Sequence, residues 1–197
     1  MQAQHIDNRG GQAKIYGDNL AISAITLNND TENGQAGTIA ARRQLNLGVK
    51  NLTNREQALI FSEGNLNIGG RLNADYQAEG WADSVQNNSA TIEAGDDLHI
   101  AAGTLHNTNE HFKTELVETG REHIVEYSAH GRTERYREGT QAELGWTIFN
   151  DESDQLRTPD GQRHENWYKY DYWRTTQQTQ VTETAPANII AGGNLTL

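Results

Sequence analysis

The most regular feature of the sequence is a short phrase in which apolar and polar residues alternate. The fullest copies read Gly-Asp-Asn-Leu-Ala-Ile at residues 17–22 and Gly-Asp-Asp-Leu-His-Ile at residues 95–100. Shorter copies begin at Gly64 and Gly193, and Gln-Leu-Asn-Leu at residues 44–47 is a degenerate one. An apolar residue at every second position is typical of a strand with one buried face.

Each copy belongs to a longer repeating unit. Leu20 is followed seven residues on by Leu27 and then by Asn29, and the copies that start at Leu45 and Leu98 keep this spacing. The Gly just before each strand suits a turn, because Gly takes positive φ without cost. A further short apolar segment precedes each phrase, at residues 14–16, 38–40, 58–60, 90–92 and 188–190. Three short strands in each repeat of 21 to 32 residues predict an all-β fold, a right-handed parallel β-helix or solenoid.

The repeat is interrupted once and then resumes in phase. Ile-Glu-Ala-Gly-Asp-Asp-Leu at residues 92–98 finds its next match in Ile-Ile-Ala-Gly-Gly-Asn-Leu at residues 189–195. The stretch between them holds three of the four Trp and five of the seven Tyr residues. The pattern therefore divides the chain into β-helix coils at 1–107, an inserted extension at 108–187 and the start of the next coil at 188–197.

Two long strands are expected within the insertion, at residues 111–127 and 165–183. The segment Thr-Pro-Asp-Gly at 158–161 is a strong turn signal, and a second lies around Gly131. These features predict a long antiparallel β-hairpin that leaves one coil and returns to the next.

Composition narrows the classes of function. The net charge of −11 argues against nucleic acid or an anionic membrane as partner. The chain has no Cys, which excludes disulfides and thiolate-bound metals. No run approaches the roughly 18 apolar residues of a membrane helix, so no membrane insertion is expected. Because the first residues lack the pattern of a signal peptide and the sequence stops within a repeat, we expect it to be a piece of a longer protein.

Three groups of polar residues are candidates for a catalytic or metal-binding site. Asp96 and Asp97, with Asp18, could form paired carboxylates for acid–base chemistry, but an Asp after Gly is favoured as a turn former. The acidic run at 150–154 lacks the ligand order of a calcium loop, which favours a solvated loop. The remaining candidates are His99, His106 and His111, which lack a tight metal-binding spacing and are expected on the surface. We expect no catalytic residue, no metal and no cofactor.

The aromatic residues of the insertion are the candidate partner contacts. Exposed Tyr and Trp are enriched in binding hot spots, but a thin hairpin also needs cross-strand aromatic pairs for support. Both roles remain open, and structural support is the more favoured of the two. The candidates are Trp146, Phe149, Trp167, Tyr168, Tyr170, Tyr172 and Trp173.

These motifs resemble a known family. The phrase Ile-x-Ala-Gly-Asp-Asp-Leu-x-Ile-x-Ala-x-x-Leu-x-Asn at residues 92–107 resembles the haemagglutinin repeat of filamentous-haemagglutinin-type exoproteins of two-partner secretion. Residues 142–151, 156–161 and 179–186 resemble the stalk of contact-dependent growth inhibition exoproteins. The family's secretion and toxin patterns are absent from this sequence, so neither activity is carried over.

The resemblance implies a secreted, non-catalytic segment of a bacterial cell-surface filament. Such a filament is tethered at the outer membrane, presents a receptor-binding region and delivers a C-terminal toxin to neighbouring bacteria, a virulence-type function. Its partners would be an outer-membrane transporter during secretion and a receptor on the target cell. One alternative is a carbohydrate-active β-helix enzyme, a lyase or glycosidase, which a groove with stacked Asp and Arg or Lys would favour. Another is a host-cell adhesin.

Overall fold

The computed structural model describes residues 1–137, 155–158 and 160–197, and every regular element in them is a β-strand. The expected all-β class is therefore confirmed. The described residues contain no helix long and apolar enough to cross a membrane. The chain divides into two compact units, one formed by residues 1–113 and 181–197 and the other by residues 114–180.

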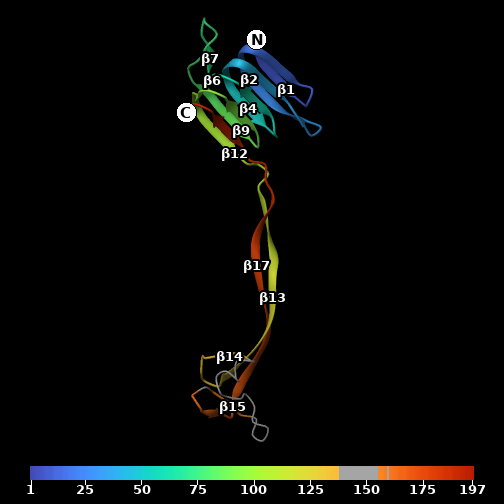
Figure 1. Ribbon diagram of the computed structural model, residues 1–197, viewed down its shortest axis with the longest axis vertical. Helices are drawn as coiled ribbons and strands as arrows, with labels where there is room; N and C mark the ends of the chain where they lie inside the picture. The colour runs from blue at the N-terminus through green and yellow to red at the C-terminus, as the bar shows by residue number, and fades with distance from the viewer. Residues whose placement is uncertain (138–154, 159) are drawn as a thin grey trace. The chain divides into compact units, whose positions relative to one another are not determined.

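A 12-stranded, mainly parallel sheet forms the first unit and is nearly closed into a barrel-like shape (Figure 1). A two-stranded antiparallel ribbon, β7–β8, lies outside this sheet. The strands of this unit are β1 (His5–Arg9), β2 (Lys14–Glu32), β3 (Gln35–Ala36), β4 (Thr38–Arg55), β5 (Leu59–Ser62), β6 (Asn65–Gly69), β7 (Arg71–Leu72), β8 (Ala78–Glu79), β9 (Ala82–Asn88), β10 (Thr91–Ala94), β11 (Leu98–Ile100), β12 (Ala102–Thr108), β18 (Asn188–Ala191) and β19 (Leu195–Thr196).

Equivalent residues of successive repeats pair directly, so their side chains form columns inside the sheet. The Leu of the repeated phrase pairs in register from Leu20 through Leu45, Leu66 and Leu98 to Leu195. The three central members are fully buried. A second column joins the Ile residues that precede each phrase, namely Ile15, Ile39, Ile60, Ile92 and Ile189. This register confirms that the repeat resumes in phase after the insertion, as predicted.

The glycines before the strands differ from expectation. None of Gly17, Gly64, Gly95 and Gly193 has the positive φ that the turn chemistry predicted. A Cβ atom added at Gly64 or Gly95 would instead lie closer than 3.0 Å to a backbone carbonyl oxygen of the preceding repeat. Glycine is required there because neighbouring levels of backbone approach closely.

Replacing Gly95 by Ala is expected to lower the free energy of unfolding by about 1–3 kcal/mol, because the added methyl group collides with backbone that cannot move away. The matched control is Gly103→Ala, where the nearest atom is 3.2 Å from the added Cβ and φ is also not positive. Urea unfolding of both variants measures the difference. Equal stability would contradict the close-approach explanation.

A ladder of buried Asn side chains runs along one corner of the sheet. The amide of Asn8 donates to Asn29 at 2.7 Å, Asn29 donates to Asn54 at 2.8 Å, and Asn54 donates to Asn87 at 2.8 Å. Asn87 continues the ladder to Asn107 at 2.8 Å. The same amides also donate to backbone carbonyls of the turn, such as those of Leu59 and Thr91. Every level of the ladder therefore ties one turn to the next.

The second unit is built on two long paired strands, β13 (Lys113–Ala129) and β17 (Trp167–Glu183). Residues with higher numbers on β13 contact residues with lower numbers on β17: Thr119 bonds to Thr176, and Glu122 bonds to Arg174. The pair is therefore antiparallel, as predicted for the hairpin. Short strands β14 (Tyr136–Arg137), β15 (Leu156–Arg157) and β16 (Arg163–His164) complete the described part.

A small apolar cluster lies in the second unit, where Tyr127, Ala129 and Leu156 are buried. The predicted turn at 158–161 is present, because the amide of Gly161 donates to the carbonyl of Thr158 at 2.8 Å and Gly161 has a φ of 83°. The turn brings β15 and β16 together as an antiparallel pair.

Candidate functional site

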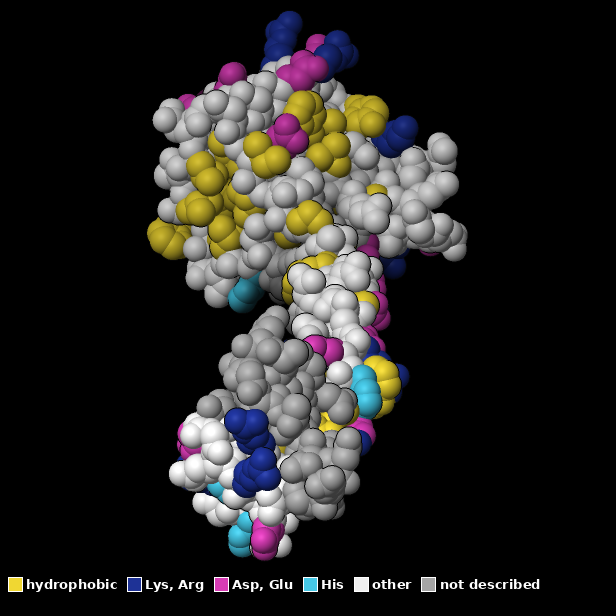
Figure 2. Space-filling model, turned by 60° about the horizontal axis from the view of Figure 1, so that its bottom comes forward, with side chains coloured by type: hydrophobic (Ala, Val, Ile, Leu, Met, Phe, Trp, Pro, Cys, Tyr) yellow, Lys and Arg dark blue, Asp and Glu magenta, His cyan; other side chains and the backbone are white. Residues whose placement is uncertain are grey.

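Large side chains are exposed in both units, and Figure 2 shows hydrophobic ones gathered over the unit that holds the parallel sheet. The aromatic side chains of the second unit are the predicted partner contacts. The structure places Tyr168, Tyr172 and Trp173 on the surface, with 49%, 37% and 56% of each residue exposed. Trp146 and Phe149 lie outside the described residues.

The aromatic residues at the start of β17 contact one another and the facing strand. The half-buried ring of Trp167 lies 5.7 Å from the ring of Tyr127 in the small apolar cluster. The ring of Tyr168 lies 5.6 Å from His130 and 6.5 Å from Tyr170. Trp167 therefore has a packing role, whereas Tyr168 offers a partly open ring.

Arginine side chains cover two of the rings. The guanidinium of Arg135 lies 3.9 Å from the centre of the Tyr170 ring, and that of Arg121 lies 4.6 Å from the centre of the Trp173 ring. The ring of His123 also lies 5.0 Å from that of Trp173. These contacts hold the rings in place by cation–π attraction. The sequence alone does not place the two arginines, because Arg121 meets Trp173 only through the register of β13 with β17, and Arg135 lies in the segment between β13 and β14.

Carboxylates fix the face of the paired strands that carries Tyr170 and Tyr172, which is opposite to the face of Trp173 because side chains alternate along β17. Glu122 accepts hydrogen bonds from Arg137 at 2.7 Å and Arg174 at 2.6 Å, which hold the pKa of Glu122 below its usual range. The hydroxyl of Tyr172 donates to Glu126 at 2.9 Å, and this bond raises the pKa of Tyr172. The arrangement is a pre-ordered aromatic and charged surface, which is the chemistry of protein recognition.

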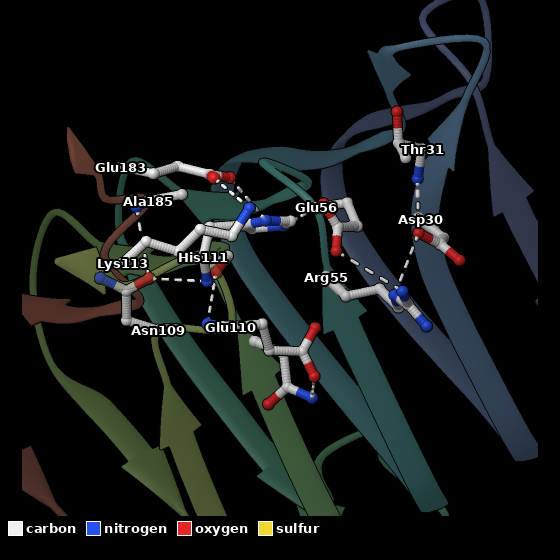
Figure 3. A network of polar contacts seen from close by, with 12 residues as sticks. Asp30, Thr31, Arg55, Glu56, Asn109, Glu110, His111, Lys113, Glu183 and Ala185 are labelled. Atoms are coloured by element: carbon white, nitrogen blue, oxygen red, sulfur yellow. Dashed lines mark hydrogen bonds and ion pairs between the residues drawn. The ribbon is translucent and has the colours of Figure 1, made fainter. Parts of the chain in front are cut away.

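A second polar network lies where the chain leaves and re-enters the parallel-sheet unit (Figure 3). His111 places Nε2 2.8 Å from Glu56 and Nδ1 3.2 Å from Glu183. Glu183 also pairs with Lys113. The hydrogen bond to Glu56 is the main cause of a raised pKa at His111, and Lys113 is the main cause of a lowered pKa at Glu183. The network is complete when His111 is charged and Glu183 is ionised.

This network makes a prediction for pH. The pKa of His111 is raised on folding, so its contribution to stability is full below about pH 6.5, the ordinary value, and is lost as pH rises through the folded pKa. Histidine NMR titration is expected to show a pKa for His111 above the ordinary value of 6.5. Glu56→Gln should move the pKa of His111 back toward its ordinary value. A His111 that titrates at the ordinary value in the unchanged protein would contradict the network.

The other candidates occupy structural positions. Asp18 pairs with Arg42 at 2.9 Å. Asp97 accepts from the backbone amide of Asn194, in the next repeat, at 2.7 Å. His99 and His106 are exposed, and the described residues contain no cluster of three or more His, Cys, Asp or Glu that could hold a metal ion. The acidic run at 150–154 lies outside the described residues.

Comparison with models of protein families, with curated proteins and with solved structures gave no match for this chain.

Proposed function

We propose that the parallel sheet is a right-handed β-helix in which each level contains three strands. The chain passes through β5, β6 and β9, and then through β10, β11 and β12. Each strand of the second set pairs directly with its counterpart in the first: β10 with β5, β11 with β6 and β12 with β9. β18 and β19 pair in the same way with β10 and β11. This repetition is what supports a solenoid.

The function proposed for the chain is structural and adhesive. The observation that carries it is the set of columns, up to five residues deep, whose central members are buried. A stack of repeated levels provides length without enclosing a reaction chamber. Residues 114–180 form a separate unit with a charged aromatic surface. In this proposal the stack is the scaffold and the inserted unit contacts the partner.

The repeat and insertion motifs extend the proposal to a place in the cell. By their resemblance, the chain is the haemagglutinin-repeat stalk of a contact-dependent growth inhibition exoprotein, secreted through an outer-membrane transporter and exposed on the bacterial surface. Its partner is then a receptor on a neighbouring cell, to which the full protein delivers a toxin. The contacts of Asp18 and Asp97 support this non-catalytic role over a carbohydrate-active enzyme, because both carboxylates serve local structure.

Binding of the labelled chain to Gram-negative bacterial cells, measured by flow cytometry, tests the proposal. The double variant Tyr168→Ser and Trp173→Ser is expected to bind at least about tenfold less, since exposed aromatic residues supply much of the energy of an interface. Tyr76→Ser, which removes a ring that is 69% exposed on the parallel-sheet unit, is the matched control. Absence of cell binding, or equal binding by the double variant, would overturn the proposed role.

A further inference from the structure

The outer face of the parallel sheet carries a hollow between two aromatic side chains. Tyr16 on β2 pairs in register with Ala40 on β4, and Ala40 pairs with Phe61 on β5. The residues before them, Ile15, Ile39 and Ile60, belong to the inner column. Because side chains alternate between the two faces of a sheet, Tyr16, Ala40 and Phe61 point outward together.

The small side chain in the middle creates the space. Neighbouring strands lie about 4.8 Å apart, so the strands that carry Tyr16 and Phe61 are separated by about 9.6 Å, with only a methyl group between them. Side chains of a sheet stand roughly perpendicular to it, so the two rings form opposite walls. The hollow has a volume of about 330 Å³ and is bordered by Arg42 and Glu63.

The dimensions suit a saturated six-membered ring. A ring that contacts an aromatic wall on each side at about 4 Å needs walls about 8 Å apart, so it fits within the separation of about 9.6 Å between the two strands. The charged groups at the rim offer both a donor, the guanidinium of Arg42, and an acceptor, the carboxylate of Glu63, for hydroxyl groups.

We infer that this hollow is a carbohydrate-binding site that clamps one pyranose ring of a glycan between Tyr16 and Phe61. In a β-linked chain of gluco-configured rings, the hydroxyl groups are equatorial and the axial C–H groups point to both faces of each ring. Both faces can therefore pack against aromatic rings. A galacto-configured ring has an axial hydroxyl on one face, which would be desolvated against a ring without a partner.

The site binds without cleaving. Of the described residues that line the hollow, only Glu63 carries a carboxylate, whereas hydrolysis of a glycosidic bond ordinarily uses two. Asp18 lies beyond the lining and is paired with Arg42. The inference does not rest on the proposed role of residues 114–180, because the hollow belongs wholly to the parallel-sheet unit.

Titration calorimetry of the full chain with cellotetraose tests this site. The expected dissociation constant is on the order of 1 mM, as for a single-ring contact. The β-1,4-linked galactotetraose is expected to bind at least about tenfold more weakly. Its axial C4 oxygen, which carries the linkage within the chain and is a hydroxyl only at the non-reducing end, blocks one face of each ring. Equal binding of the two sugars, or no saturable binding of cellotetraose, would overturn the inference.

Variants separate the hollow from the rest of the surface. Ala40→Leu fills the space while leaving both walls, and Tyr16→Ala removes one wall; each is expected to weaken cellotetraose binding at least about tenfold. Trp81→Ala, which removes an aromatic residue that is 70% exposed and outside this column, should bind as the unchanged protein does. All three changes lie on exposed or half-buried positions, and thermal melting confirms that each variant is folded.

The same variants keep this inference distinct from the proposed function. Loss of cellotetraose binding in Ala40→Leu with cell binding retained supports the hollow and leaves the role of residues 114–180 intact. Cellotetraose binding that is unchanged in both Ala40→Leu and Tyr16→Ala contradicts the hollow, whatever the cells show.

Discussion

Replacing Leu98 by Asp is expected to lower the free energy of unfolding of the parallel-sheet unit by about 3–5 kcal/mol, which is the usual cost of an uncompensated buried charge. Leu98 has no exposed surface and pairs on one side with Leu66 and on the other with Leu195. Its column is apolar at every level, so a carboxylate there finds no cation. Since a typical domain has only about 5–15 kcal/mol of stability, the change should remove a large share of it.

The neighbouring residue provides the control for this prediction. His99 is exposed and faces away from the column, so His99→Asp is expected to change stability by no more than about 0.5 kcal/mol. Chemical denaturation followed by circular dichroism measures both variants. If Leu98→Asp were as stable as His99→Asp, the buried columns would not hold the sheet together.

The second large effect is expected at Asn54, in the middle of the Asn ladder. Asn54→Ala should cost about 2–4 kcal/mol, because it leaves the side-chain oxygen of Asn87 and the carbonyl of Thr91 without this donor inside the protein. It also removes the acceptor of Asn29, whose amide keeps its bond to the carbonyl of Leu59. The loss should spread to both neighbouring turns, which amide hydrogen exchange can locate.

Asn28→Ala is the matched control for the ladder. Asn28 donates to Asp7 at 2.8 Å across β1 and β2, the strands that Asn8 and Asn29 join in the ladder, but the bond is exposed to water. Exposed pairs contribute little, so the expected change is within about 0.5 kcal/mol. A similar cost at both positions would mean that the buried ladder has no special role.

The columns could be predicted from sequence because their signal is local and repeated. Leu45, Leu66 and Leu98 occupy the same place in the same phrase, so their pairing needed only the period of the repeat. The ladder could be predicted in part. Asn29, Asn54 and Asn107 stood out by their spacing, but Asn8 and Asn87 follow no full copy of the phrase.

The glycines and the inserted unit show where such prediction ends. The reason for Gly95 is the closeness of backbone one level away, which no local turn preference reveals. The hollow at Ala40 likewise depends on two neighbours that lie 24 and 21 residues away along the chain. In the second unit, the aromatic strand β17 was predicted. The arginine over Trp173 required the register with the facing strand, and the arginine over Tyr170 required the path of the chain after that strand.

The most direct test of the scaffold and its separate inserted unit is hydrogen exchange on a chain in which residues 114–180 are replaced by a short Gly/Ser linker. Loop length itself costs little, and the columns through Ile60 and Ile92 are complete without the deleted residues. Amides of β5, β6, β10 and β11 are therefore predicted to keep the protection that they have in the full chain. Exchange of these amides at the rate of an unfolded chain would contradict the division into a self-supporting parallel-sheet unit and a separate inserted unit.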